Sequence, residues 1–536
     1  MTRSLRPIPD RPSFALVNGR IFTVDEKLPW ASAVLVSNKQ IVAVGTNKEV
    51  LDQAPADTEV IDLGGRMVMP GIHDAHTHLL FSGLKFRYEG RLTQMAGPEQ
   101  IVQDLENCCK SHDFDNLTGW VIAGEYTPMA FPDGRPDRAY LDAVFPDQPV
   151  FLWDYSIHHG LANSKALELA GITSDTPDPA GGRFIRRPGS TEVSGELVEQ
   201  ATWPVSRAIP DYPAEIYRDA LSWAVKVCNS VGITSIQEAS AGWQGLRALT
   251  ELDASDELTL QVAAHIVWRE ETAGMASLAD LERLIDERSK HSSTHVRTDF
   301  VKLWLDGAPL PPHFTESRLT DAGEPDRDNI LVPPDELRTA LLRFDAEGIQ
   351  VKIHCAGMGS IRVALDAFEE VRRVNGPDGP AHEIAHCTYI DESDYPRFRE
   401  LGVIADMSPA IWHIPELEAV LSEGYRFASL RKAGAHLTVG SDWIITPDPN
   451  LFPALQGMLQ RGEQSVGLDY ALRALTIEGA KAVGLADRQG SVEVGKSADL
   501  IVLDRNLFEV DVNEIGGTKV LATIFEGRPV YQVPAI

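Results

Sequence analysis

The most informative run in this sequence is Met69-Pro70-Gly71-Ile72-His73-Asp74-Ala75-His76-Thr77-His78. It begins like a short buried strand and ends in two histidines spaced two residues apart. Side chains two apart on an extended strand point to the same side, so His76 and His78 can present both imidazoles to one point. A divalent metal ion binds neutral nitrogen donors arranged in this way. Short motifs of this kind also occur by chance, so the meaning of the pair depends on the rest of the chain.

The composition of the 536 residues is typical of a globular protein, with 43% hydrophobic and 24% charged residues. The length fits one large barrel with an appended domain. The formal net charge is 49 − 78 = −29, and a surface this acidic repels nucleic acid and anionic membranes, so we expect neither as a partner. The sequence has no apolar run of the ~18 residues that suggest a membrane span, and no signal-peptide core follows Met1. The five cysteines form no Cys-x-x-Cys pair, which favours a reducing cytoplasm.

Both ends of the chain consist of short β-rich runs separated by turn residues, which predicts strands. The runs are 14–23, 33–36, 41–45 and 60–65 at the beginning, and 490–496, 499–503 and 520–525 at the end. Because these ends flank a long middle of different character, we expect residues 1–67 and 488–536 to build one small β-sandwich domain together.

The middle of the chain alternates short apolar runs with stretches of helical period, which is typical of an α/β protein. Candidate strands are 69–73, 233–238, 261–267, 300–306, 351–354, 383–387, 403–408 and 438–443. Eight strands are what a TIM-like (β/α)8 barrel requires, and we place this barrel at residues 68–487. The interval 79–232 is too long for one connection, so it predicts a large insertion after barrel strand 1 that covers the barrel mouth.

Polar side chains stand at the ends of these candidate strands, where the active sites of such barrels lie. They are His76 and His78 after the first strand, Lys302 on the fourth, His354 on the fifth, His386 on the sixth and Asp442 on the eighth. A lone histidine is more often a satisfied core residue. Four histidines at strand ends favour metal ligation instead.

This set and order of residues resemble the amidohydrolase superfamily of metal-dependent hydrolases. The resemblance spans nearly the whole chain and includes the lead-in Gly64-Gly65-Arg66-Met67-Val68-Met69-Pro70-Gly71 and the closing Gly495-Lys496-Ser497-Ala498-Asp499-Leu500. A narrower resemblance is to the amidohydrolase-3 branch, which includes N-substituted formamide deformylases. It rests on Phe131-Pro132-Asp133-Gly134, on Asn163-Ser164-Lys165-Ala166-Leu167-Glu168-Leu169-Ala170-Gly171-Ile172 and on Gly440-Ser441-Asp442-Trp443.

The residue types indicate their roles. The four histidines are donors suited to zinc, as one or two ions, and bound zinc would lower the pKa of water from 15.7 toward ~7. Asp442 would be the general base and, by the resemblance, also a metal ligand. An ammonium has no lone pair, so Lys302 is an unusual ligand. The resemblance implies that Lys302 is N6-carboxylated and bridges two metals; the alternative is an ion pair with Asp306 or another carboxylate.

Further residues are candidates for substrate contact. We name His159, Asn163, His265 and Trp443 for this role. Either His158 or His159 could hydrogen-bond the substrate carbonyl oxygen, or both could be loop residues without a role. Trp304, Trp412, Trp443 and Met358 could shape an apolar pocket, although aromatic residues more often belong to a core.

We therefore expect a cytoplasmic metal-dependent hydrolase that cleaves a non-peptide amide-type C–N bond of a small molecule. A deaminase, or an ester, lactone or carbamate hydrolase, would use the same site. A non-catalytic binding protein derived from the fold is an alternative of a different class, although such proteins typically lose ligands and none is missing from this set. The family resemblance suggests a homo-oligomer, most simply a dimer.

Overall fold

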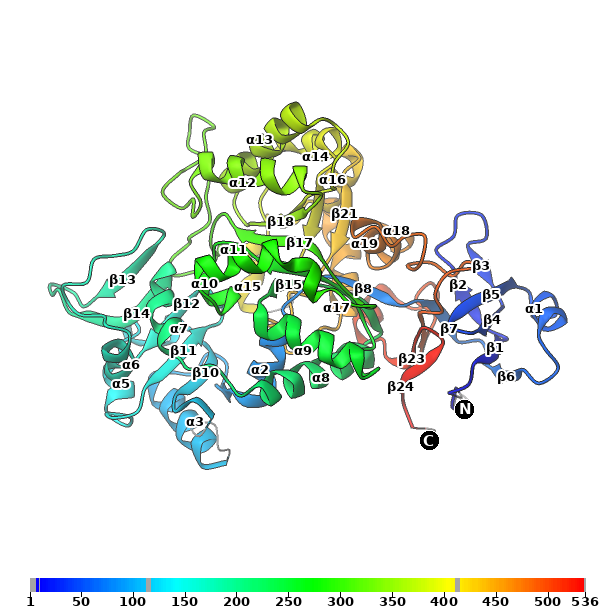
Figure 1. The fold of residues 1–536 in the computed structure, drawn as a ribbon, viewed down its shortest axis with the longest axis horizontal. Coiled ribbons are helices and arrows are strands. Elements are labelled where there is room, and N and C mark those ends of the chain that lie inside the picture. Colours follow the sequence, from blue (N-terminus) through cyan, green and yellow to red (C-terminus); the bar gives the residue numbers. More distant parts are fainter. Residues whose placement is uncertain (1–5, 9, 112–116, 410–414, 535–536) are drawn as a thin grey trace.

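The computed structural model describes residues 6–8, 10–111, 117–409 and 415–534. Figure 1 shows a central barrel, with sheets from the two ends of the chain on one side and the long inserted segment on the other. The two ends lie together, since the backbone N–H of Ile8 donates to the side-chain oxygen of Gln532 at 2.7 Å. Within the described residues, no helix combines the length and apolar character that crossing a membrane requires.

The barrel is an eight-stranded sheet in which each pair of neighbouring strands is parallel. Its strands are β8 (Ile72–Thr77), β15 (Ile233–Ala241), β16 (Gln261–Val267), β17 (Val296–Trp304), β18 (Gln350–Cys355), β19 (Glu383–His386), β20 (Ile404–Met407) and β21 (His436–Val439). The sheet order is β21-β20-β19-β18-β17-β16-β15-β8. A parallel bridge between Thr77 and Trp443 joins the two edges, which nearly closes the sheet. The predicted TIM-like barrel is thus confirmed.

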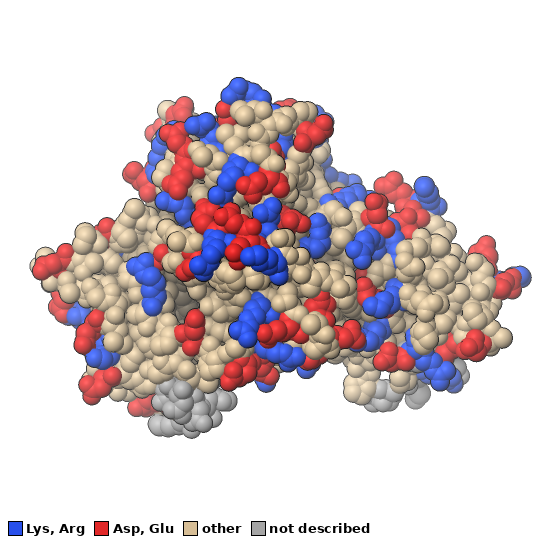
Figure 2. Space-filling view, in the orientation of Figure 1, with Lys and Arg blue, Asp and Glu red and all other residues tan. Residues whose placement is uncertain are grey.

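Helices surround this sheet in the order that the βα alternation predicts (Figure 1). They are α2 (Leu79–Tyr88), α8 (Ala214–Ser230), α9 (Trp243–Ala254), α10 (Glu271–Gly274), α11 (Leu278–Asp286), α12 (Pro334–Ala346), α13 (Met358–Asn375), α14 (Tyr395–Leu401), α15 (Pro415–Leu421), α16 (Phe427–Ala433), α17 (Phe452–Leu459), α18 (Leu468–Ala474) and α19 (Ile477–Ala482). Their apolar faces and the outward faces of the strands form one continuous buried core. The charged side chains of both signs lie intermixed over this face of the molecule (Figure 2).

The first and last barrel strands have different bounds from those predicted. The run expected as one strand at 69–73 divides at Gly71: β7 (Met67–Pro70) pairs with strands of the chain ends, and β8 starts only at Ile72. A Cβ on Gly71 would lie 2.1 Å from the Thr234 hydroxyl, so only glycine allows this close passage. The strand expected at 438–443 ends at Val439, which places Asp442 in the loop beyond it.

Two further sheets are built from the ends of the chain. One has the order β5-β4-β1-β6 and consists of β1 (Ser13–Val17), β4 (Ala33–Ser37), β5 (Gln40–Gly45) and β6 (Glu59–Asp62), next to α1 (Asn47–Gln53). The other has the order β24-β23-β22-β7-β2-β3 and joins β2 (Arg20–Phe22), β3 (Trp30–Ala31) and β7 to β22 (Leu500–Leu503), β23 (Val520–Phe525) and β24 (Arg528–Gln532). Side chains of both sheets share a buried cluster that includes Phe14, Val34, Leu500 and Ile524.

The inserted segment between α2 and α8 has a sheet of its own, in the order β13-β14-β12-β11-β10-β9. Its strands are β9 (Gly90–Arg91), β10 (Val121–Tyr126), β11 (Val150–Asp154), β12 (His159–Ala162), β13 (Gly182–Arg186) and β14 (Val193–Glu199). Its helices are α3 (Pro98–Ser111), α5 (Ala139–Asp142), α6 (Ser164–Leu169) and α7 (Trp203–Ala208). It contacts the barrel at α10 and along the loop after β17, which brings its side chains to the carboxyl ends of the strands.

Candidate metal centre

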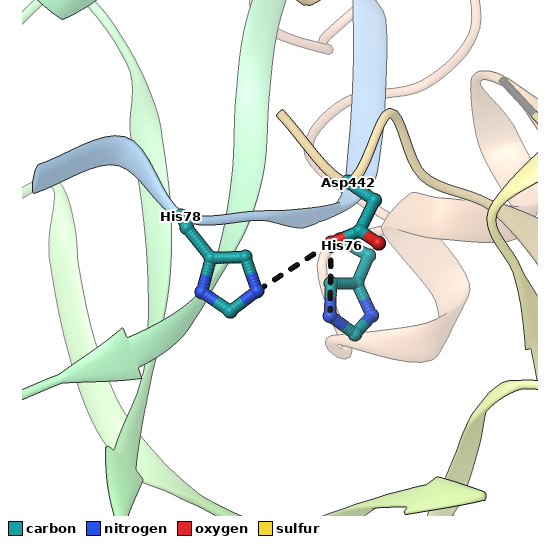
Figure 3. Close-up of side chains that lie close together, drawn as sticks. All are labelled: His76, His78 and Asp442. Atoms are coloured by element: carbon teal, nitrogen blue, oxygen red, sulfur yellow. Dashed lines mark ion pairs between the residues drawn. The ribbon is translucent and has the colours of Figure 1, made fainter. Parts of the chain in front are cut away.

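His76, His78 and Asp442 form the tightest cluster of metal-binding side chains in the described part of the chain. One ligand atom from each lies within 4.8 Å of the others. Asp442 Oδ1 is 3.5 Å from His78 Nε2 and 4.0 Å from His76 Nε2 (Figure 3). The backbone N–H of Asp442 donates to the carbonyl of His76 at 2.7 Å, and Asp442 adopts a φ of 51°. The barrel closure therefore positions this carboxylate against the two histidines.

His354 and His386 extend this cluster from the next strands of the barrel. The ring centroid of His386 lies 4.6 Å from that of His76 and 4.3 Å from that of His354. Asp442 Oδ2 is 3.8 Å from His386 Nδ1. His386 Nε2 is buried and has no hydrogen-bond partner among the described residues. Four imidazoles and one carboxylate thus converge at the carboxyl end of the barrel.

Hydrogen bonds orient three of these imidazoles. The Nδ1 atom lies 3.0 Å from Asp406 Oδ2 in His76, 2.8 Å from Ser240 Oγ in His78 and 3.2 Å from Asp306 Oδ1 in His354. Because Nδ1 is engaged in each ring, Nε2 is the nitrogen left to bind a metal. Metal-binding histidines are commonly held in this way, with a carboxylate or hydroxyl on the other nitrogen.

The environment keeps the buried histidines neutral. Burial, followed by nearby positive groups, holds the pKa of His76, His354 and His386 well below the usual value. A neutral imidazole has the free lone pair that a metal ligand needs. These side chains therefore fit a late divalent ion such as zinc in charge state as well as in geometry.

Lys302 lies on β17 with its side chain fully buried, and its Nζ is 3.3 Å from His76 Nε2. Burial and the neighbouring ammonium of Lys352 lower the pKa of Lys302 to about 7. The lysine is thus placed beside the histidine cluster, and the ion pair with Asp306 that we considered is absent, since the ion pairs of the described residues give Asp306 only His354.

Lys352, Asp406 and Glu383, which the sequence analysis did not single out, and Asp306, which it named only as a partner for Lys302, support the cluster. Lys352 Nζ lies 2.7 Å from Asp406 Oδ2 and 3.2 Å from Glu383 Oε2, so the three buried charges compensate one another. Asp306 accepts hydrogen bonds from the backbone of Ala356 and Gly357 as well as contacting His354. The period of two along a strand could have indicated Lys352, which lies two residues before His354 and shares its face.

The inserted segment adds His158 to the edge of this site. Its ring centroid lies 5.2 Å from that of His354, and its Nδ1 is 3.1 Å from Glu199 Oε2. Burial opposes the charge of His158, but Glu199 outweighs it and raises the pKa to about 9. Glu199 also accepts a hydrogen bond from Thr315 at 2.5 Å. His158 is therefore held rigidly beside the proposed ligands.

Two of the residues proposed for substrate contact, His159 and Asn163, lie in the inserted segment. His159 is buried on β12 with its ring 5.1 Å from that of His313, and His313 bonds Glu196 at 2.8 Å. The side chain of Asn163 caps α6 and also bonds the backbone of Val150 and Phe145.

The other proposed contacts are enclosed by protein. His265 is fully buried, 3.6 Å from Glu383. Trp443 is fully buried and stacks on Phe86 at 5.9 Å, so it packs in the core and does not face a pocket. Trp304 and Met358 are partly buried, and Trp412 lies outside the described residues.

Comparison with known proteins gives a consistent result. The model of the amidohydrolase family matches residues 59–531. The chain is 28% identical to an N-substituted formamide deformylase of Arthrobacter pascens over 96% of this chain and 97% of that protein. It is 26% identical to the protein LONG AFTER FAR-RED 3 of Arabidopsis thaliana over 96% and 91% of the two chains. A metal-dependent hydrolase from Pyrococcus horikoshii OT3 has the same fold, with a TM-score of 0.73 and 23% identity over 94% of this chain and 99% of that one.

Proposed function

Because the chain belongs to the amidohydrolase family, whose model covers residues 59–531, we propose that this metal-dependent hydrolase cleaves a non-peptide amide C–N bond of a small molecule. N-substituted formamides are the proposed substrate class, in line with the deformylase of Arthrobacter pascens. The observation that carries the proposal is the convergence of four imidazoles with Asp442, one ring nitrogen of His386 being buried without a partner among the described residues.

The residues present fit a metal centre. His76, His78, His354 and His386 would hold the ion through nitrogen, with Asp442 as an oxygen ligand, and zinc suits this donor set. When bound, such an ion makes hydroxide available at neutral pH by lowering the pKa of water from 15.7 toward ~7. N6-carboxylation of Lys302 would add carboxylate oxygens next to His76 and allow a second ion.

Asp442 would act as the proton shuttle. Its two oxygens lie within 4.0 Å of three of the histidines, so it can accept a proton from the attacking water and deliver it to the leaving amine. His158 would donate from Nε2 to the substrate carbonyl oxygen, because Glu199 engages its Nδ1. This choice of His158 rests on its contact with His354, whereas His159 faces His313.

The proposal is tested by metal analysis of the purified protein, followed by a screen of N-formyl compounds, other amides, carbamates and lactones. We expect at least one divalent ion per chain and turnover of an N-substituted formamide, lost on Asp442→Asn. Full activity of Asp442→Asn would refute the shuttle, ammonia release from an amino heterocycle would indicate a deaminase, and metal-free protein would favour a binding function.

The state of Lys302 is tested separately. If a carboxylated Lys302 bridges two ions, Lys302→Ala will bind no more than one ion per chain, and the intact protein will carry a 44 Da adduct that is lost at acid pH. Two ions bound to Lys302→Ala would refute the bridge.

A further inference from the structure

A hollow of about 160 Å³ lies where the inserted segment meets the barrel. Its lining includes Met95, Met129, Tyr155, Pro311, Leu417 and Ile445. These residues come from four separate parts of the fold: the inserted segment, the loop after β17, helix α15 and the loop after β21.

Two walls of the hollow belong to the same short segments as Asp442 and His158. The backbone N–H of Ile445 donates to the carbonyl of Asp442 at 3.2 Å, so this wall continues directly from the proposed proton shuttle. The hydroxyl of Tyr155 donates to the carbonyl of Pro311 at 2.6 Å, which joins the opposite walls, and Tyr155 precedes His158 by three residues. A substrate whose amide group reaches Asp442 and His158 therefore has one end beside the hollow.

The chemistry of the lining favours an uncharged apolar group. Met95 and Met129 both line the hollow and are 48% and 54% exposed, so a bound apolar group would cover part of their surface. The carboxylate of Glu125 at the rim is paired with Lys85 at 3.1 Å and Arg91 at 3.4 Å, so its charge is compensated. A cationic or anionic substituent would gain little there.

The size of the hollow agrees with this chemistry. A cavity of ~150 Å³ lined by aliphatic and aromatic side chains is large enough for benzene. We propose that the hollow binds a ring-sized apolar N-substituent of the amide substrate, and this assignment rests on the proposed amide hydrolysis. The two methionines adapt to several ring shapes, because the thioether chain is flexible.

Steady-state kinetics test the assignment with N-benzylformamide and N-methylformamide. Met129→Trp fills the hollow from its exposed rim, and Leu169→Trp on α6 is the matched control, since Leu169 is 50% exposed and does not line the hollow. We expect Met129→Trp to lower kcat/KM for N-benzylformamide by ~10-fold or more. With Met129→Trp, kcat/KM for N-methylformamide should change less than twofold. With the control Leu169→Trp, kcat/KM for both substrates should change less than twofold. Equal losses for the two formamides with Met129→Trp would overturn the proposal.

A binding measurement separates this proposal from the proposed activity. Protein labelled with 13C at its methionine methyl groups is titrated with benzyl alcohol, a neutral probe of the ring that needs no turnover. We expect saturable shifts of the Met95 and Met129 resonances, assigned with Met95→Leu and Met129→Leu, and no saturable shift in Met129→Trp. Absence of these shifts in the wild type overturns the apolar site even if a formamide is hydrolysed. Their presence upholds it even if no formamide is hydrolysed.

Discussion

At the residue scale, the contact between Asp406 and His76 determines which nitrogen of the imidazole faces the metal centre. With Asp406 Oδ2 at 3.0 Å from Nδ1, the ring keeps its hydrogen there and offers Nε2. Loss of such a partner typically weakens metal binding by ~10–100-fold. We expect this loss for Asp406→Asn, measured by competition with a chelator. Asp394→Asn is the control, because Asp394 is equally buried but pairs with Arg362. Unchanged metal affinity in Asp406→Asn would contradict the orienting role.

His158 also acts at the residue scale, but through the substrate and not the metal. If its Nε2 donates to the carbonyl oxygen in the transition state, His158→Gln should lower kcat by ~100-fold or more while metal content stays unchanged. His436→Gln is a suitable control, since His436 lies at the opposite end of its strand and bonds Glu478. Loss of bound metal in His158→Gln would instead make it a ligand, and an unchanged kcat would remove it from the mechanism.

At the scale of elements, the end of β21 approaches β8 so closely that side-chain size is restricted. A Cβ on Gly440 would lie 2.3 Å from Cβ of His76. Gly440→Ala should therefore displace His76, reduce metal content and destabilise the fold by about 1–3 kcal/mol. Elemental analysis and denaturant unfolding measure the two effects. Gly517→Ala is the matched control, because a Cβ there meets no described atom within 4 Å. Full metal content in Gly440→Ala would contradict this prediction, because it would show that β8 can shift while the metal ligands keep their positions.

These elements could be predicted from sequence where they are short, separate apolar runs. The eight barrel strands were found because each is a compact apolar run, and the six polar residues at their ends stood out by type. The division at Gly71 was missed because the apolar run Met67–Pro70 leads through one glycine directly to Ile72, so the two strands read as one. In β7, Pro70 pairs with Leu500 of β22, more than four hundred residues later in the chain. Local sequence pattern does not reveal a pairing between residues so far apart.

The supporting residues illustrate a second limit of sequence. Lys352 and Asp406 lie on different strands and acquire a role only when the barrel brings them to 2.7 Å. Trp443 was named as a candidate substrate contact that could shape an apolar pocket, and its ring lies 5.9 Å from those of Phe86 and Trp223 in the core. Sequence therefore indicated which residues carry chemistry at strand ends, whereas the direction of each side chain depended on packing between distant segments.

At the scale of the whole molecule, one charge cluster joins the barrel to the sheets of the chain ends. His295, just before β17, has Nδ1 2.6 Å from Asp253 Oδ1 and Nε2 3.3 Å from Glu526 Oε1. Glu526 lies in the turn between β23 and β24 and also pairs with Lys39 at 2.7 Å. Three parts of the chain that are remote in sequence thus share one ionisable junction.

This junction makes stability depend on pH in a definite direction. Burial opposes the charged form of His295, but Glu526 and Asp253 outweigh it and raise its pKa above 6.5. Its contribution is therefore complete below pH 6.5 and is lost as the pH rises through the raised value. The close contact with His295 lowers the pKa of Glu526 to about 2, so the contribution of Glu526 is complete above pH 4.5 and is lost as the pH falls toward 2. The junction is strongest between these limits.

We expect the melting temperature to fall between pH 6 and 9 by roughly 2 °C more in the wild type than in His295→Gln, which has no group to titrate there. Differential scanning calorimetry at low salt measures this difference. Lys39→Met is the control, because it removes the exposed partner of Glu526 and should retain the pH dependence of the wild type. Parallel pH profiles of the wild type and His295→Gln would show that His295 does not couple the barrel to the terminal sheets.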